Sequence, residues 1–500
     1  MSPGPEATDL PSRTFFGHPI GLANLFFTEM WERFSYYGMR ALLVLFLVDA
    51  VNHGGFGLDD RTATAIYGLY TASVYLFALG GGWLADRVMG GQRAVLIGGV
   101  IIACGHLLLG FAGEARVFYL GLVVIVAGTA LLKPNVSAMV AQLYPEGGAR
   151  SDAGFTLYYM GINLGAMIGP LVTGWLAQRY GWHWGFGAAA AGMILGVLQF
   201  AATRHQLGVA GREPHGLPNG ADPRRILGWL LGLAALVALL VGLAWSGALR
   251  LDPIAVQAGS TQIIVVAALL YFAYLLTGAG LTSLEKKRVW LLLVLFLGCA
   301  LFWSGFEQAG SSFNLFAERY TRLQYGALHI PAAWFQSVNS VFLVLLAPVM
   351  TALWMSLGAR RLDPSAPVKF ALGLAGMAGG FIVLAGAAHF VAAGQQVGPQ
   401  WLILTYLLHT IGELALSPIG MSACAQLVPQ RFVGQVLGLW FLGMSLGNLI
   451  ASRLAGNFDP ANTAAMPGQF MNIFWFGMVS AVALLIASHF IQRWIRNSER

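Results

Sequence analysis

The chain has 500 residues, of which 57% are hydrophobic and only 10% are charged. Its mean hydropathy is +0.69 and its formal net charge is +7. Soluble globular domains carry about 25% charged residues, so this composition excludes a soluble protein and indicates one that crosses a lipid bilayer many times. The positive charge does not indicate a nucleic-acid partner, because the Lys and Arg residues are scattered over short loops in runs of at most three and form no basic groove.

Apolar runs bounded by charges, glycines and prolines predict fourteen membrane-crossing helices. In chain order we expect them at 20–49, 63–88, 92–112, 116–142, 152–177, 182–203, 225–249, 259–281, 287–316, 332–357, 368–392, 399–426, 432–455 and 468–495. Residues 1–19 are polar and lack the apolar core of a signal peptide, so we expect the first helix itself to insert into the membrane.

The spacing of these helices predicts two related six-helix bundles. The expected parts are a cytoplasmic tail (1–19), an N-terminal bundle (20–205), a cytoplasmic linker with an inserted helical pair (206–286), and a C-terminal bundle with its tail (287–500). Lys and Arg are concentrated in the segments on one side, which predicts a cytoplasmic (inner) membrane location with both termini in the cytoplasm. Transporters with two such halves bind substrate between them, near the midplane.

The first predicted helix carries four ionisable side chains at membrane depth, namely Glu29, Glu32, Arg33 and Arg40. At 100° per residue they share one stripe with Tyr36. Each charge placed in lipid costs about 2.5–3.5 kcal/mol, so such groups pair with one another or face a water-filled cavity. Two carboxylates that share one guanidinium form an acid–base switch, because protonation of one changes how the others pair. A purely structural ion-pair network is the alternative.

Three further charges lie far downstream in apolar runs, namely Lys133, Glu307 and Glu413. Lys133 could extend its ammonium to the membrane surface, but apolar sequence continues after it, which favours a side chain that faces the bundle. A lone Glu that faces lipid is costly, so we expect Glu307 and Glu413 to face the interior. His409 precedes Glu413 by four residues, and without a second ligand motif we interpret it as a hydrogen-bonded packing histidine rather than a proton relay or a metal ligand. We expect no metal site.

Small residues carry a second pattern. Gly161, Gly165 and Gly169 recur at the spacing that lets two membrane helices approach closely.

The three cysteines, Cys104, Cys299 and Cys424, are isolated in apolar runs and have neither metal spacing nor a disulfide pattern. We therefore interpret the cysteines as small buried hydrophobic residues.

Five motifs in this order resemble the proton-coupled oligopeptide transporter (POT) family of the major facilitator superfamily, over nearly the whole chain. They are Glu29-x-x-Glu32-Arg33, GGWLADR at Gly81–Arg87, FTLYYMGINLG at Phe155–Gly165, GELALSPIG at Gly412–Gly420 and GLWFLG at Gly438–Gly443. The resemblance implies an all-α polytopic fold of the bacterial type, with two inserted helices between the six-helix bundles. It also implies import of di- and tripeptides together with protons, without a cofactor.

Carried over by position, the resemblance implies that proton coupling uses Glu29, Glu32, Arg33 and Glu307. The implied substrate-binding residues are Arg33, Tyr37, Arg40, Tyr75, Lys133, Asn163, Trp303, Glu307, Asn339, Glu413, Ser417 and Trp440. Lys133 and Glu413 would also form a cytoplasmic gate, and they supply the cationic and anionic partners that a zwitterionic peptide needs. The second helix lacks the histidine that some relatives use. Arg61 and Glu318 align only approximately with an outer gate, so the residues of that gate stay open.

Other functions are weighed against this one. The same architecture could serve another small solute, such as nitrate, a sugar or a drug-like molecule. A membrane enzyme would need a catalytic dyad or a metal cluster at the membrane surface. We identify no HExxH, GxSxG or paired-aspartate motif of that kind, so we expect a transporter rather than an enzyme. A receptor or scaffold would not need deep charges that titrate. The sequence is compatible with a monomer.

Overall fold

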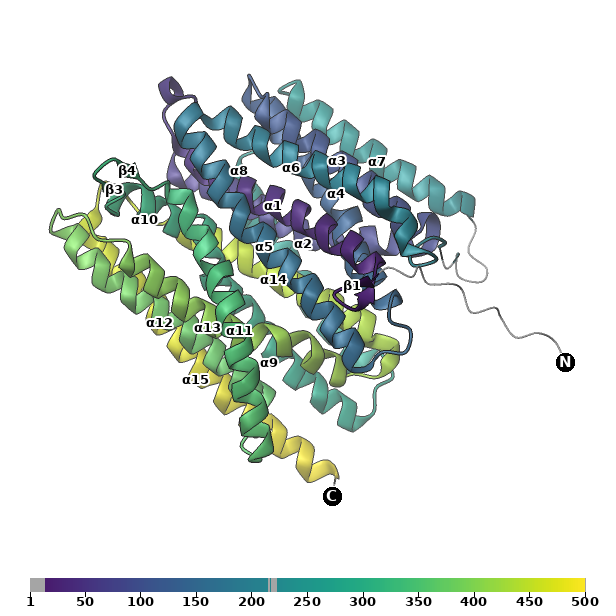
Figure 1. Cartoon of the computed structure of the whole chain (residues 1–500). Coiled ribbons are helices and arrows are strands. Elements are labelled where there is room, and N and C mark those ends of the chain that lie inside the picture. Colours follow the sequence, from purple (N-terminus) through teal and green to yellow (C-terminus); the bar gives the residue numbers. More distant parts are fainter. Residues whose placement is uncertain (1–13, 215, 217–222, 500) are drawn as a thin grey trace. The chain divides into compact units, whose positions relative to one another are not determined.

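The structure is a computed structural model, and it describes residues 14–214, 216 and 223–499. Most of these residues lie in helices (Figure 1), which confirms the all-α prediction. Two short antiparallel hairpins were not predicted: β1 (Thr14–Phe15) pairs with β2 (His18–Pro19), and β3 (Gln324–Tyr325) pairs with β4 (Leu328–His329). Strands of two residues are too short to leave a periodic pattern in the sequence.

The fourteen long helices of the described part lie close to the predicted ranges. Their ends agree within about four residues, except that the eighth helix begins six residues early and the ninth ends ten residues early. They are α1 (Gly21–Val48), α2 (Asp60–Leu84), α3 (Gly91–Gly110), α4 (Ala115–Gln142), α5 (Gly148–Tyr180), α6 (Trp182–Thr203), α7 (Pro223–Trp245), α8 (Pro253–Thr277), α9 (Ser283–Phe306), α11 (Phe335–Ala359), α12 (Ala366–Ala392), α13 (Gln400–Gln426), α14 (Val433–Ala455) and α15 (Met466–Glu499). Short helical turns are η1 (Val51–His53), η2 (Ala85–Met89), η3 (Arg204–Leu207), η5 (Ala332–Trp334), η6 (Gln430–Phe432) and η7 (Thr463–Ala465).

The ninth helix is broken, whereas the prediction was one helix over 287–316. α9 ends at Phe306, and a 3-10 turn, η4 (Glu307–Gly310), leads into α10 (Ser312–Tyr320). Between them Ser311 leaves the helical region, with φ −122° and ψ −95°. The backbone at Gly310 packs so closely on the Tyr67 hydroxyl of α2 that a Cβ atom would overlap it. Because the apolar run continues through the break, hydropathy alone could not reveal it.

Among the described residues, eleven helical segments are long and apolar enough to cross a membrane. α1 is not one of them, because every 18-residue window of this helix contains at least three of its four charged residues. The helix that we expect to carry the chemistry thus departs in composition from a simple span. Its charges require partners inside the protein.

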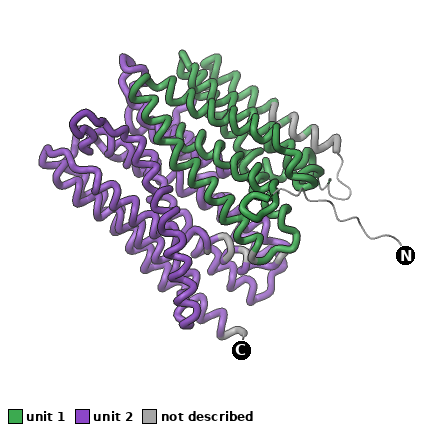
Figure 2. Tube along the Cα trace, viewed as in Figure 1, with its two compact units in different colours: residues 1–39, 77–250 green, residues 40–76, 251–500 purple. Residues whose placement is uncertain are grey.

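The described chain forms two compact units (Figure 2). Unit 1 is Met1–Met39 with Phe77–Arg250, and unit 2 is Arg40–Leu76 with Leu251–Arg500. In unit 1, α3 packs along α4 and α6; in unit 2, α12 packs along α13 and α15. In each predicted bundle the third helix therefore contacts the fourth and the sixth, as two related bundles would. The inserted pair is divided, with α7 in unit 1 and α8 in unit 2.

The glycine pattern of α5 packs this helix against α1. A Cβ atom at Gly161, Gly165 or Gly169 would overlap backbone or side-chain atoms of α1, at Phe26, Met30 and Phe34 respectively. Close packing at this spacing confirms the prediction made for the three glycines. It also brings the polar face of α5 beside the charged stripe of α1.

The segment that follows α6 is docked onto unit 1, although its sequence predicts a linker without structure. The Gln92 side chain donates to the Ala210 carbonyl at 2.8 Å, and the Gln92 backbone N–H donates to the Gly211 carbonyl at 2.8 Å. The Gly211 N–H in turn donates to the Gln142 side chain at 2.6 Å. Leu207 is buried beside these contacts. Hydrogen bonds with Gln92 of α3 and Gln142 of α4 thus hold this segment in place, although its sequence has no helical periodicity.

The cysteine prediction is right for two residues and wrong for the third. Cys299 and Cys424 are buried, whereas Cys104 on α3 is exposed. An apolar run identifies a membrane helix but not which face of it packs inside the protein. On a helix that we expect to lie in lipid, an exposed Cys costs little, since the surroundings are themselves apolar.

Candidate functional site

Arg33 lies between two carboxylates of the same helix, α1. Its Nε atom is 2.8 Å from Glu29 Oε1 and 2.7 Å from Glu32 Oε2, and all three side chains are buried. The guanidinium also lies 5.5 Å from the ring centroid of Tyr36. Protonation of either carboxylate would therefore change the partner that Arg33 holds. The role of this cluster in proton coupling stays a prediction.

Helices α4 and α5 bring further polar groups to this cluster. The hydroxyl of Tyr158, on α5, interacts with the Glu29 carboxylate and lies 3.1 Å from Ser137 Oγ on α4. Lys133, also on α4, is close enough to Glu32 for its positive charge to act on that carboxylate. Lys133 thus faces the interior of unit 1, as predicted, rather than extending to the membrane surface.

The GGWLADR motif supports the part of α4 that carries Lys133. The next residue, Pro134, has no N–H group and leaves the Ala130 carbonyl without its helical donor. The backbone of Gly81 packs so closely on that carbonyl that a Cβ atom would overlap it, and Gly82 lies against the Pro134 ring. We infer that the two motif glycines are needed for this close approach.

Arg40 forms a second buried ion pair, within unit 2. Its Nη2 atom is 2.6 Å from Glu307 Oε2, and its Nε–H donates to the Tyr67 hydroxyl at 2.6 Å. The guanidinium carbon lies 5.6 Å from the Tyr67 ring centroid, and all three side chains are buried. Glu307 is the first residue after α9, so the break in the ninth helix places a carboxylate where Arg40 of α1 can reach it.

Glu413 lies near this pair, on α13. The Asn339 amide of α11 donates to Glu413 Oε2 at 3.0 Å and to Thr410 Oγ1 at 3.0 Å. Glu307 is close enough for its charge to act on Glu413. Asn339, Glu307 and Glu413, which the sequence separates widely, are therefore neighbours in unit 2.

The other predicted binding residues have mixed exposure. Four of them are buried: Tyr75, Asn163, Trp303 and Trp440. Tyr37 and Ser417 are half-buried, as is Lys133. The Asn163 amide donates to a backbone carbonyl of its own helix at 2.9 Å. Lys133 belongs to unit 1 and Glu413 to unit 2, so the gate between them stays a prediction.

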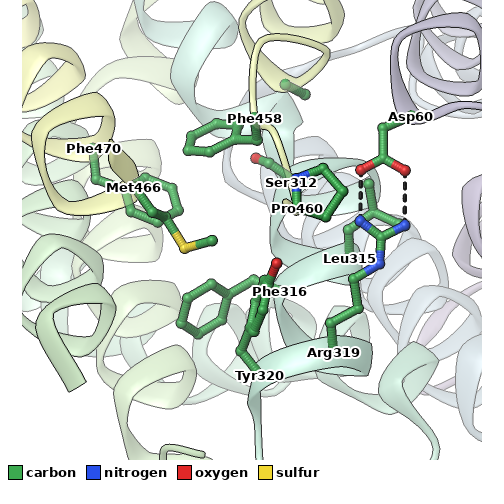
Figure 3. A pocket seen from close by; sticks show the side chains of 11 residues that line it. Asp60, Ser312, Leu315, Phe316, Arg319, Tyr320, Phe458, Pro460, Met466 and Phe470 are labelled. Carbon is green, nitrogen blue, oxygen red and sulfur yellow. Dashed lines mark hydrogen bonds and ion pairs between the residues drawn. The ribbon is translucent and has the colours of Figure 1, made fainter. Parts of the chain in front are cut away.

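An ion pair that the sequence did not identify joins the start of α2 to the end of α10. Both Nη atoms of Arg319 donate to the two carboxylate oxygens of Asp60, at 2.6 and 2.7 Å (Figure 3). It involves the immediate neighbours of Arg61 and Glu318, the residues that aligned approximately with an outer gate. A cavity of about 20 Å³ lies beside it, lined on its apolar side by Phe316, Phe458, Met466 and Phe470.

Asp59 fixes the start of α2 next to this pair. The Thr62 backbone N–H donates to Asp59 Oδ1 at 3.0 Å, and the Thr62 hydroxyl donates to Oδ2 at 2.7 Å. These hydrogen bonds, the backbone one first, lower the pKa of Asp59 below its usual range. Asp59 thus stays ionised at the helix N-terminus, where a negative charge is favourable.

His409 has a packing role in this structure. Its ring is buried on α13, stacked on Phe306 with 6.1 Å between ring centroids. The rings of Phe313 and Phe381 each lie 5.4 Å from it. Aromatic rings surround the imidazole, as expected of a packing histidine, whereas its Nε2 atom has no hydrogen-bond partner among the described residues.

The sequence does contain one stretch with the GxSxG spacing of a serine-hydrolase motif, contrary to the expectation that it has none: Ser445 lies in GMSLG at Gly443–Gly447. In such enzymes the serine is exposed on a sharp turn between a strand and a helix. Here Ser445 is buried within α14, and its hydroxyl donates to the Ala72 carbonyl of α2 at 2.9 Å. The motif therefore marks a contact between two helices rather than a nucleophile.

Comparison with known proteins places this site in a family. A model of the POT family matches residues 92–219 and 281–476. A peptide transporter of Yersinia enterocolitica is 41% identical over 506 residues, covering 99% of this chain and 98% of that protein. The chain belongs to the POT family. A di-/tripeptide transporter of Lactococcus lactis subsp. cremoris is 35% identical over 458 residues, covering 90% of this chain and 91% of that protein.

Solved structures of the POT family share the fold. The crystal structure of a POT peptide transporter in complex with sulfate matches with a TM-score of 0.91 and 40% identity, covering 97% of this chain and 98% of that one. A POT family transporter in complex with a thioalcohol conjugated peptide matches with a TM-score of 0.87 and 32% identity, covering 96% and 99%. Membership of the POT family confirms a major facilitator fold, and a multi-pass membrane transporter rather than an enzyme.

Proposed function

We propose that this protein is a proton-coupled symporter that imports di- and tripeptides by alternating access. The observation that carries the proposal is the Arg40–Glu307 ion pair, 2.6 Å long and buried, which ties α1 to the end of α9. Relatives named as peptide transporters, one of them a di-/tripeptide transporter, support the substrate class. We propose a single chain as the transporting unit.

Protonation of Glu307 supplies a coupling step. A buried pair that loses one charge leaves the other uncompensated, which costs several kcal/mol unless a new partner appears. Arg40 then keeps its hydrogen bond to the neutral Tyr67 hydroxyl, whereas its contact with Glu307 at the end of α9 weakens. A proton that enters would thereby loosen the contact between the two helices, and its release would restore it.

Lys133 and Glu413 are proposed as the two poles for the peptide termini. Lys133 would bind the carboxylate of the peptide and Glu413 its amino group, between the bundles 20–205 and 287–500. The Asn339 hydrogen bond holds the Glu413 carboxylate in place, which supports a fixed anionic pole. Nitrate or a sugar would need only one pole or none.

Residues 40–76 indicate which side of the transporter is closed in this structure. Although we assign them to the first bundle, they pack within unit 2, through Arg40–Glu307, Asp60–Arg319 and Ala72–Ser445. With cytoplasmic termini, these residues lie toward the outside. We therefore assign Asp60–Arg319 to the outer gate and this structure to a state closed at the outer side.

The orientation is tested by cysteine labelling in intact cells. We expect a membrane-impermeant maleimide to label cysteines at Glu114 and Gln396 and not one at Glu146. All three positions are exposed in short connections between helices. Labelling only at Glu146 would reverse the orientation and with it the outer gate. Disruption of the cells before labelling serves as the control, because it should make all three positions react.

The function is tested by uptake of labelled dialanine into proteoliposomes. With an inward proton gradient we expect accumulation, and without a gradient only equilibration. Liposomes without protein control for leakage. Equal uptake with and without the gradient would contradict proton coupling, whereas gradient-driven uptake of nitrate or a sugar in place of dialanine would favour another solute.

A further inference from the structure

We propose that the inserted helix α8 braces the outer side of the transporter through the side chain of Gln257. The contacts of α2 at Asp60–Arg319, Gly68–Ser452 and Ala72–Ser445 are called here the outer clasp. The word "outer" rests on the orientation proposed above. The brace itself consists of contacts within unit 2 alone.

α8 has one face toward the protein and one away from it. Its buried residues form a stripe at helical spacing: Gln257, Ile264, Ala268, Phe272 and Leu275. Large apolar side chains such as Ile263 and Leu270 are exposed on the other face, as expected for contact with lipid. Gln257 is the polar member of the buried stripe. An amide at such a position is costly unless another helix supplies partners.

α14 supplies those partners. The Gln257 Nε2 amide donates to Ser452 Oγ at 2.5 Å and to the Leu449 carbonyl at 3.3 Å. The Ser452 hydroxyl donates to the same Leu449 carbonyl at 3.0 Å. Since both Gln257 and Ser452 are buried, the amide and the hydroxyl fix one another's orientation on the side of α14 toward α8.

The oriented serine fills the space that a glycine of α2 leaves. A Cβ atom at Gly68 would overlap the Oγ and Cβ atoms of Ser452, so no larger residue fits beside this rotamer. Gly456, one turn beyond Ser452, likewise lies against Arg61 and Thr64. Gln257 therefore acts on the outer clasp through Ser452, as a positioning residue. The other inserted helix, α7, belongs to unit 1 and has no part in the brace.

In alternating access the outer clasp must open. Loss of the Gln257 amide would let Ser452 rotate away from its fit against Gly68, which weakens the closed side relative to the open one. A typical buried hydrogen bond changes such an equilibrium by roughly 3- to 10-fold. We therefore expect Gln257→Leu to favour the outward-open state to that extent, without contact to peptide or proton sites.

The test measures how fast a cysteine inside the clasp reacts from outside. In a background without native cysteines, Ala72→Cys is treated with a membrane-impermeant maleimide, without peptide or gradient. Gln257→Leu should raise the labelling rate roughly 3- to 10-fold, Ser452→Ala should do the same, and the double variant should add little. Gln262→Leu, on the exposed face of the same helix, is the matched control and should leave the rate unchanged.

Three results would overturn the brace. An unchanged rate in Gln257→Leu, while Asp60→Asn labels faster, would show that the clasp exists but does not depend on α8. Equal increases in Gln257→Leu and Gln262→Leu would show general loosening of the helix. No increase in any variant, Asp60→Asn included, would show that the clasp itself is wrong, independently of dialanine transport. If Gln257→Leu does not fold, Ser452→Ala and Gln257→Asn carry the same test.

Discussion

Replacement of Glu307 by glutamine is expected to abolish accumulation of peptide under a proton gradient while exchange of peptide across the membrane continues. Glutamine keeps the shape of the side chain but cannot release a proton, and it leaves Arg40 without its anionic partner. Exchange requires binding and conformational change, whereas accumulation also requires a group that titrates. A charge-assisted hydrogen bond changes an equilibrium by roughly 10- to 150-fold, so gradient-driven uptake should fall to the level without a gradient.

The same result is expected for Glu29→Gln and Glu32→Gln, because each removes one of the two carboxylates that share Arg33. The measurement is dialanine uptake with a gradient beside counterflow with unlabelled peptide inside the vesicles. Glu114→Gln, an exposed carboxylate in a loop, is the matched control and should transport normally. Normal accumulation by all three variants of buried carboxylates would refute their role in coupling.

The second large effect concerns Lys133 and Glu413, the proposed poles for the peptide. Lys133→Ala and Glu413→Ala should each reduce dialanine uptake at least roughly 10-fold, since each removes the proposed charged partner of one peptide terminus. The exchanged variant, Lys133→Glu with Glu413→Lys, should insert but transport poorly. It would present reversed poles to the peptide, and a lysine at 413 would face the Asn339 amide, which is also a donor.

The exchanged variant distinguishes two roles of Lys133 and Glu413: recognition of the peptide termini, and a structural ion pair between the two residues. Its folding is checked by size-exclusion chromatography in detergent beside the parent protein. Addition of Asn339→Asp to the exchanged variant restores an acceptor beside position 413 without restoring the poles, so uptake should stay low. Uptake near that of the parent by either exchanged variant would show that the two charges only hold the bundles together, and zwitterion recognition would fail as an explanation.

Helix positions and the charged stripe of α1 could be predicted because both depend on local sequence. Apolar runs set the length of each span, and the spacing of Glu29, Glu32 and Arg33 places them on one face of any helix. The ion pairs to Arg33 then follow from geometry within a single helix. The partner of Arg40 did not follow, because Glu307 is distant in the chain and was grouped with the binding and coupling residues only by family resemblance.

Features that depend on contacts between helices could not be predicted from the sequence. The break after Phe306 forms where Gly310 meets Tyr67, and the run of apolar residues gives no sign of that contact. The ion pair between α2 and α10 uses Asp60 and Arg319, and a shift of one residue on each helix cannot be resolved by approximate alignment. The brace from α8 likewise depends on Gln257, and the sequence does not show which polar residue of this helix, Gln257 or Gln262, faces a partner inside the protein.

The docked segment after α6 has a consequence for dividing the protein into two separately produced chains. Leu207, Ala210 and Gly211 belong physically to unit 1, since they cover the ends of α3 and α4. A first fragment that ends at Thr203 would uncover the Met139 side chain, on which Gly211 packs, and leave the Gln142 side chain without its backbone donor. A fragment that continues through Arg212 keeps them covered. Complementation between two fragments should therefore depend on nine residues that look, by composition, like a dispensable linker.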